Sequence, residues 1–284
     1  MTTLLAVPNV SEGRDRSTLD ALEAAFAKRA RVLDVHTDAD HHRSVFTMAG
    51  EPGTLHEALL SGAAEAVARI DVTAHEGEHP RIGALDVAPI VFLDPADRGA
   101  ACAEALLTAD ALAHRLDIPV FLYGELAGGR TRAELRRGGP ANLARRIEAG
   151  ELTPDYGPRR LHPTAGATLV SARPPLVAFN VVVDAAVDRA RDIAAAIREG
   201  GPEGLPGVRA IGLKLRTQGL TQVSTNIEDH TRVTAAQVVE AVRRHAPVAS
   251  AELVALAPRA ALRDFPPDVP LSGAGNVIED ALGR

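Results

Sequence analysis

The chain alternates short runs of period-two apolar residues with longer segments in which apolar residues recur every three or four positions. Period two is typical of half-buried strands, and the three-to-four spacing is typical of amphipathic helices. In the first half, this pattern predicts six elements in the order β-α-β-β-α-β. They are strand 4–10, helix 18–29, strand 32–36, strand 44–49, helix 52–67 and strand 84–93.

The same order returns after Arg173-Pro174-Pro175. The second set is strand 176–183, helix 186–198, strand 208–215, strand 221–226, helix 234–245 and strand 251–256. This order is that of the ferredoxin-like unit, an antiparallel sheet with helices on one face. We therefore expect an α+β protein of two ferredoxin-like βαββαβ subdomains, residues 1–174 and 175–284, whose sheets are covered by helices and which hold a ligand in a cleft between them.

The segment between the repeats adds a helix at 98–118 and a short strand at 120–122. Residues 130–146 then carry six arginines, and residues 153–165 contain three prolines. Such a region can form the lid or wall of a cleft, while a solvated helix face is the simpler interpretation of the arginines.

Composition excludes several classes of protein. Hydrophobic residues make up 46% and charged residues 24%, as in ordinary folded domains. The formal net charge is −6 and aromatic residues make up 3%, so neither a basic footprint nor a stacking surface for nucleic acid is present. Short apolar stretches and the absence of a signal-like start predict no membrane span and a cytoplasmic location. The single cysteine, Cys102, lies in an alanine-rich segment and is interpreted as core.

The segment from His75 to Val87 contains the pattern His-Glu-x-x-His, which is typical of helical zinc-protease sites. That chemistry needs both histidines on one helix turn. Gly77 lies between the histidines and Pro80 follows His79, and a proline disfavours the α conformation in the preceding residue. The pattern therefore predicts a loop, without zinc.

His79 is the candidate catalytic residue. An imidazole titrates near pH ~6.5, so it can accept a proton and later donate it at neutral pH. The alternative is that His79 only caps the following strand and meets solvent.

Three loops carry further residues that could bind a ligand. Residues 38–43 join two strands and contain Asp38 and Arg43, and their spacing fits no standard metal motif, so no metal is expected. Residues 222–226 offer amide and hydroxyl groups to a heterocycle edge, although alternation sends only half of them to one face. The longest candidate loop comprises Gly157, Pro158, Arg159, Arg160, Leu161, His162, Pro163, Thr164, Ala165 and Gly166.

Five separated motifs together resemble the glutamate formiminotransferase family. They are residues 7–14 (VPNVSEGR), 79–87 (HPRIGALDV), 120–125 (VFLYGE), 154–158 (PDYGP) and 222–226 (QVSTN), in the family's order and over nearly the whole chain. The duplicated ferredoxin-like subdomains also resemble the family's architecture. The chain has no room for the cyclodeaminase domain that is fused to this enzyme in animals.

The resemblance implies transfer of a formimino group from N-formimino-L-glutamate to N5 of tetrahydrofolate, in a homodimer. It implies that His79 is the base and that residues 157–166 bind folate. Asp38, Arg43 and Arg81 are the expected substrate-binding residues, with both arginines holding glutamate carboxylates. The chain has His42-Arg43 where animal members have an Asn-Arg pair, which leaves the carboxylate partner of His79 unassigned.

Two alternatives stay open. The same site geometry suits formyl transfer from N-formylglutamate, because both donors present the same glutamate. A folate-binding protein without transferase activity is the other.

Overall fold

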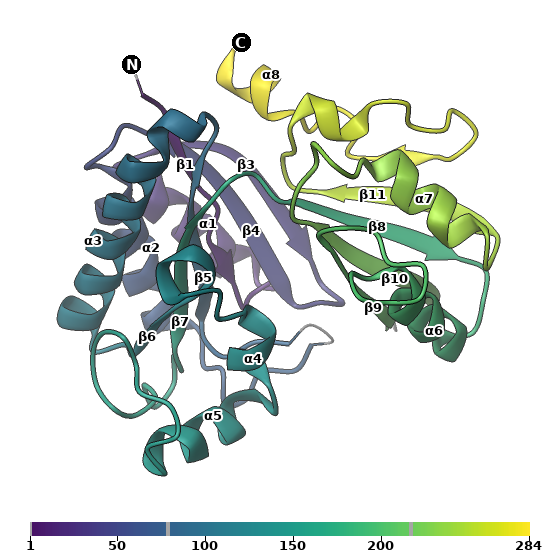
Figure 1. The fold of residues 1–284 in the computed structure, drawn as a ribbon. Coiled ribbons are helices and arrows are strands. Elements are labelled where there is room, and N and C mark those ends of the chain that lie inside the picture. Colours follow the sequence, from purple (N-terminus) through teal and green to yellow (C-terminus); the bar gives the residue numbers. More distant parts are fainter. Residues whose placement is uncertain (1, 78–79, 216–217) are drawn as a thin grey trace. The chain divides into compact units, whose positions relative to one another are not determined.

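The computed structural model describes residues 2–77, 80–215 and 218–284. The chain divides into two compact units, Met1–Pro174 and Pro175–Arg284, and each unit has its own sheet and its own hydrophobic core (Figure 1).

The first unit contains a seven-stranded sheet in its described residues. One part of it has the order β3-β4-β1/β2-β5 with antiparallel neighbours, which is the ferredoxin-like arrangement. This part of the sequence-based prediction is confirmed. The strands are β1 (Leu4–Ala6), β2 (Asn9–Val10), β3 (Arg31–Asp38), β4 (Arg43–Gly50), β5 (Leu85–Phe92), β6 (Val120–Leu122) and β7 (Thr168–Arg173).

Two details of this sheet differ from the prediction. The expected first strand, 4–10, is interrupted at Val7-Pro8, because proline has no N–H to offer the sheet. Strand β7 was missed, and it pairs in parallel with both β5 and β6, so the sheet is mixed rather than antiparallel. Five of its six residues are buried, and a strand covered on both faces shows no alternation to detect.

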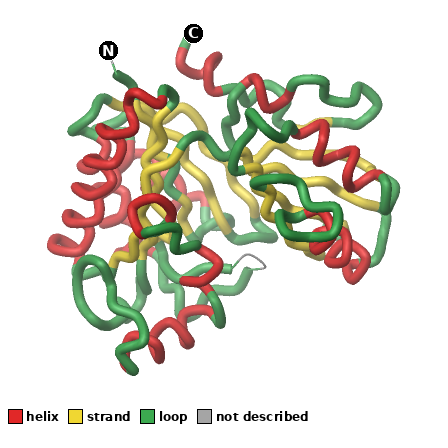
Figure 2. Tube along the Cα trace, viewed as in Figure 1, coloured by secondary structure: helices red, strands yellow, loops and turns green. Residues whose placement is uncertain are grey.

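Helices cover both faces of the first sheet, as the coloured tube shows (Figure 2). Helices α1 (Arg16–Phe26), α2 (Leu55–Arg69) and α3 (Arg98–Leu116) share one core with β1, β4 and β5. Helices α4 (Arg132–Arg136) and α5 (Gly139–Glu148) pack through a separate cluster that includes Phe121, Tyr123, Leu135 and Leu143. The expectation of helices on one face alone therefore fails at β5, which packs against helices on both sides.

The second unit is a ferredoxin-like sheet with one added strand. Its order is β12-β11-β8-β10-β9, and among its described strands only the β11–β12 pair is parallel. Helices α6 and α7 share the core of this sheet. The elements are β8 (Val177–Val183), α6 (Val187–Ile197), β9 (Val208–Leu215), β10 (Leu220–Ile227), α7 (Ala235–Arg243), β11 (Val248–Val254), β12 (Leu271–Ser272) and α8 (Ile278–Leu282).

Among the described residues, no helix combines the length and the apolar character needed to cross a membrane.

Glu104, on α3, is a buried carboxylate that ties two helices together. Its side chain is 1% exposed, and it accepts hydrogen bonds from the His56 amide at 2.7 Å and from the Gly53 amide. Both amides lie at the N-terminus of α2, where backbone N–H groups have no partner within the helix and a negative charge is favourable.

Replacing Glu104 with Ala should lower the free energy of unfolding by roughly 1.5–3 kcal/mol, because the Gly53 and His56 amides lose a charged acceptor. Urea denaturation measures this. Glu125→Ala is the matched control, since the Glu125–Arg98 pair is exposed and its loss should change stability little. Equal effects of both substitutions would show that Glu104 has no structural role of this kind.

Candidate functional site in the first unit

Asp86 is the centre of a buried charge cluster. The Asp86 side chain is fully buried, and its Oδ2 accepts a hydrogen bond from Nη1 of Arg43 at 2.8 Å. Nη2 of Arg136 donates to the same oxygen. The Ile82 amide donates to Oδ1 at 2.8 Å. One carboxylate therefore joins β4, α4 and the start of β5.

The register of the sheet explains why these groups meet. Asn9 of β2 lies between Val45 of β4 and Val87 of β5. Nε and Nη2 of Arg43 donate to Oδ1 of Asn9 at 2.9 and 2.8 Å. The Arg43 side chain thus extends across β2 to Asp86. Asn9 binds two of its guanidinium nitrogens, and Asp86 binds the third.

The cluster shifts the proton affinities of its own members. Burial alone would raise the pKa of Asp86, but Arg136 and Arg43 hold it below the usual carboxyl range. Burial lowers the pKa of Arg43 to about 10, against the opposing effect of Asp86, with nearby Arg136 and Arg132 lowering it further. Asp86 is ionised at neutral pH, and an excess of positive charge surrounds it.

The loop between β3 and β4 is held by its own side chains. Asp38 accepts from the His41 amide at 2.8 Å, and its Oδ2 lies 2.7 Å from Nδ1 of His41. Burial would raise the pKa of Asp38, and these bonds lower it overall. Asp38 is therefore bonded within the loop, and its role in substrate binding stays a prediction.

Two imidazoles stack beside this loop. The rings of His42 and His75 lie 4.0 Å apart at an angle of 30°. Nδ1 of His42 accepts from the Gly13 amide at 3.1 Å, which places the ring proton on Nε2 when this histidine is neutral. Burial, with Arg81 and His42 nearby, lowers the pKa of His75 to about 4, so this ring is neutral at pH 7.

Neither ring nitrogen of His75 forms a hydrogen bond of standard geometry within the described part of the chain. The Ser11 backbone still acts on this ring weakly and opposes the fall in its pKa.

His79, the expected base, lies outside the described residues. Residues 75–77, which precede it, are not helical, so this part of the loop prediction is confirmed. Nη1 of Arg81 lies 3.4 Å from the His75 carbonyl oxygen, and Asp86 opposes the fall in pKa that burial causes in Arg81. Arg81 is thus within electrostatic reach of the Asp86 cluster.

The two ends of the expected folate loop lie against different segments. Arg160 is exposed and pairs with Asp117 at 2.6 Å. At the other end, the Ala84 amide donates to the Ala165 carbonyl at 2.9 Å, and Nδ1 of His162 accepts from the Ala165 amide at 3.0 Å. The structure therefore brings residues 162–166 to the start of β5, and residues 157–160 lie near the end of α3.

Two glycines allow this close approach. A Cβ on Gly83 would lie 1.9 Å from the Ala167 carbonyl oxygen, and a Cβ on Gly166 would lie 2.1 Å from the Ile82 carbonyl oxygen. Gly166 also has a positive φ of 70°. Only glycine fits both positions, so the loop is clamped next to Ile82, whose amide binds Asp86.

In the second unit, residues 222–226 alternate as predicted. Val223 joins the core with α6 and α7, and Thr225 Oγ1 donates to the Phe179 carbonyl at 2.6 Å. Gln222, Ser224 and Asn226 therefore lie on the other face of β10, where they stay candidates for polar recognition.

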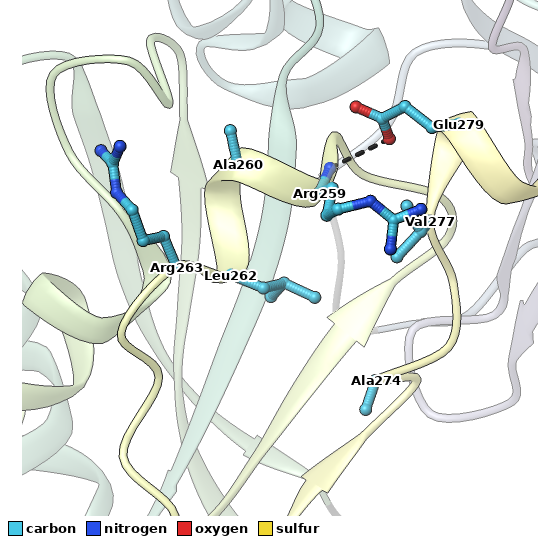
Figure 3. Close-up of a pocket in the computed structure, with 7 residues that line it drawn as sticks. All are labelled: Arg259, Ala260, Leu262, Arg263, Ala274, Val277 and Glu279. Carbon is cyan, nitrogen blue, oxygen red and sulfur yellow. Dashed lines mark hydrogen bonds between the residues drawn. The ribbon is translucent and has the colours of Figure 1, made fainter. Parts of the chain in front are cut away.

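Two pockets are lined by residues other than Asp86, Arg43 and Arg136. One, of about 650 Å³, is formed in the second unit by Arg259, Ala260, Leu262, Arg263, Ala274, Val277 and Glu279 (Figure 3). Figure 3 shows Glu279 bonded to the backbone of Arg259, at 3.0 Å, with Leu262 and Val277 giving apolar walls. The other, of about 670 Å³, is lined by several arginines of residues 130–146. Neither pocket contains a predicted site residue.

Within the described ranges, no three His, Cys, Asp or Glu side chains are grouped so that they could hold a metal ion.

Sequence reasoning missed Arg136 and Asn9 as partners in the site, and it did not give Asp86 a role. A signal for Asp86 was present, because a lone carboxylate in an apolar run that is expected to form a buried strand needs an internal partner. No local signal identifies Arg136 among six arginines of similar spacing. Arg43 was expected to be available for a substrate carboxylate, but its guanidinium is committed to Asn9 and Asp86, so that role stays a prediction.

Comparison with known families gives matches over both units. Residues 3–173 match the formiminotransferase domain, N-terminal subdomain, and residues 178–265 match the formiminotransferase domain.

Three relatives show the range of similarity. The chain is 36% identical to a glutamate formimidoyltransferase of Streptococcus pyogenes serotype M1, covering 91% of this chain and 90% of that protein. It is 33% identical to a glutamate formimidoyltransferase of Thermoplasma acidophilum, covering 100% and 98%. It is 38% identical to the formimidoyltransferase-cyclodeaminase of Rattus norvegicus, covering 91% of this chain and spanning about half, 50%, of that longer relative.

Substituting Asp86 with Asn keeps the shape of the side chain but leaves Arg43 and Arg136 without their shared anion. We expect a loss of roughly 3–5 kcal/mol in the free energy of unfolding, as for other broken buried pairs. Urea denaturation at pH 7 measures it, with Asp188→Asn as control because the Asp188–Arg191 pair is exposed. A loss no larger than that of the control would contradict the central role of Asp86.

The lowered pKa of His75 predicts a pH dependence of stability. The unfolded ring binds a proton near pH ~6.5 and the folded ring only near pH 4, so the folded state is favoured above pH 6.5 and loses this advantage as pH falls toward 4. Discounted for a ring that is only half buried, the loss by pH 4.5 should be about 1–2 kcal/mol.

Unfolding free energies of wild type and His75→Phe between pH 7 and 4.5 test this. The Phe variant should show a shallower decline than wild type. His114→Gln, which removes an exposed histidine, should decline as wild type does. Parallel curves for all three proteins would rule out the assigned pKa.

Proposed function

The chain belongs to the formiminotransferase family, and on this premise we propose that it transfers the formimino group of N-formimino-L-glutamate to N5 of tetrahydrofolate. The observation that carries this proposal is that both units match the family's domains, and that relatives named for this transfer are covered over nine-tenths or more of their length. The products would be 5-formiminotetrahydrofolate and L-glutamate. Tetrahydrofolate is thus a co-substrate.

The proposed step forms one C–N bond and breaks another. N5 of tetrahydrofolate attacks the formimino carbon and loses its proton to His79. The tetrahedral intermediate then collapses, and the bond from that carbon to the glutamate nitrogen breaks. His79 returns the proton to this nitrogen, so one imidazole serves as base and then as acid.

The surrounding groups have binding roles in this proposal. Arg81, Arg43 and Asp38 would hold the glutamate, and residues 157–166 would contact folate. Ala165 and Gly166 lie against the start of β5, the strand that carries Asp86 and that follows His79 in sequence. This contact supports the folate-binding role of the loop, because it brings the loop to the strand next to the proposed base.

The Asp86 cluster has a positioning role in the proposal. Asp86 binds the amide of Ile82, three residues after His79, and so fixes the chain that leads out of the catalytic segment. A base must stay within hydrogen-bond reach of the proton it takes, and a fixed backbone at this end limits its movement. The homodimer is proposed from the family membership, and the cytoplasmic location from the short apolar stretches of the sequence.

Replacing His79 with Ala should lower turnover by roughly two to four orders of magnitude, because general acid–base catalysis supplies about that factor. The assay follows the near-ultraviolet absorbance of methenyltetrahydrofolate after the reaction with N-formimino-L-glutamate and tetrahydrofolate is acidified. Folate binding should be largely kept, which equilibrium titration checks.

His114→Ala is the matched control, since that histidine is exposed on α3. Full activity of His79→Ala would contradict the assigned base. Turnover by wild type of N-formylglutamate but not of the formimino donor would contradict the proposed substrate.

A further inference from the structure

The cluster around Asp86 holds more positive than negative charge. Arg43 and Arg136 share one oxygen of Asp86, and each of these guanidinium side chains is only 11% exposed. Arg132 lies four residues before Arg136, on the same face of α4, and its charge acts on Arg43. Two guanidinium groups thus bind one buried carboxylate, and the charge of a third acts on one of them, in a place where unbalanced charge is costly.

The acidic residue of α4 does not correct this imbalance. Glu134 is committed to the capping box of its own helix, where it accepts from the Thr131 amide at 2.6 Å and from the Thr131 hydroxyl at 2.8 Å. Arg132 itself forms no ion pair with any residue in the described ranges. Its guanidinium carbon lies 5.7 Å from the centre of the Tyr123 ring instead.

Two further donors beside Arg132 are also unused. Nε of Arg136 and the hydroxyl of Tyr123 are buried, and neither has a hydrogen-bond partner in the part of the chain that the structure describes. A buried donor without an acceptor costs free energy, and both of these belong to residues that contact the Asp86 cluster or Arg132. The missing partner is therefore an acceptor, and the charge excess indicates that it is an anion.

We propose that Arg132, Arg136 and Tyr123 form a subsite for a carboxylate of a glutamate moiety. A carboxylate offers two oxygens, and it matches the planar donors of arginine and the hydroxyl of tyrosine. This inference rests on the proposed function, which supplies two glutamates: that of the formimino donor and the glutamyl group of the folate. The subsite chemistry is the same for both.

Arg132→Gln tests the subsite, with Arg132→Lys as the conservative variant that keeps the charge. Arg137→Gln is the matched control, because Arg137 is an exposed arginine that follows the same short helix. Steady-state kinetics would be measured for each protein with the formimino donor varied, with tetrahydrofolate varied, and with tetrahydropteroate, which lacks the glutamyl group, varied.

For Arg132→Gln we expect KM for one glutamate-bearing substrate to rise roughly ten- to a hundredfold, the factor typical of a lost charge-assisted hydrogen bond, with kcat changed much less. Arg132→Lys should recover part of this loss. A rise for the donor alone assigns the subsite to the donor. A rise for tetrahydrofolate but not for tetrahydropteroate assigns it to the folate tail. Unchanged KM values, or an equal rise in Arg137→Gln, would overturn the subsite.

A calorimetric titration with L-glutamate separates this inference from the proposed function, because it needs no turnover. We expect L-glutamate to bind the wild type and Arg137→Gln with similar affinity and Arg132→Gln at least tenfold more weakly. This result supports the subsite even if no formimino transfer is seen. Turnover with unchanged KM values and unchanged glutamate binding in Arg132→Gln would leave the proposed function standing and reject the subsite.

Discussion

The first unit depends on the burial of one carboxylate. Asp86 is fully buried in the middle of the sheet, and it stays ionised because two guanidinium groups and one amide are bonded to it. Removing a carboxylate from water is costly unless such partners are fixed in place. The positions of β4, of α4 and of the segment leading into β5 are therefore linked, and a shift in any one of them leaves a buried charge unpaired.

The same constraint explains why the candidate site forms where it does. The segment at Ile82 is held from one side by Asp86 and from the other by the glycine contact with residues 165–167. Catalytic groups need support of this kind, since an error of about 1 Å in position is expensive for a proton transfer. The His42 ring of the β3–β4 loop stacks on the His75 ring. The low pKa of His75 keeps further positive charge out of a region that already holds several arginines.

The sequence was sufficient for the parts of the fold that have a clear period. The duplicated βαββαβ order and both helix pairs were predicted correctly, because the helices have a clear three-to-four spacing of apolar residues and the strands are apolar runs bounded by turns. Strand β7 was missed since it is buried on both faces, and with it the parallel extension of the first sheet. In the candidate site, the loops could be identified from their residue types, but Arg136 could not, because its contact with Asp86 joins positions 50 residues apart. Side-chain pairing over such separations depends on the completed sheet and on the placement of α4.

The proposed function requires that an intact formimino group, carbon and nitrogen together, moves from glutamate to folate. Incubation with N-formimino-L-glutamate labelled with ¹³C and ¹⁵N in the formimino group, followed by prompt mass spectrometry of the folate at neutral pH, tests it most directly. If the intact group is transferred, both labels appear on tetrahydrofolate in equal amount. Folate that carries ¹³C without ¹⁵N from the outset, or that carries neither label, would contradict it.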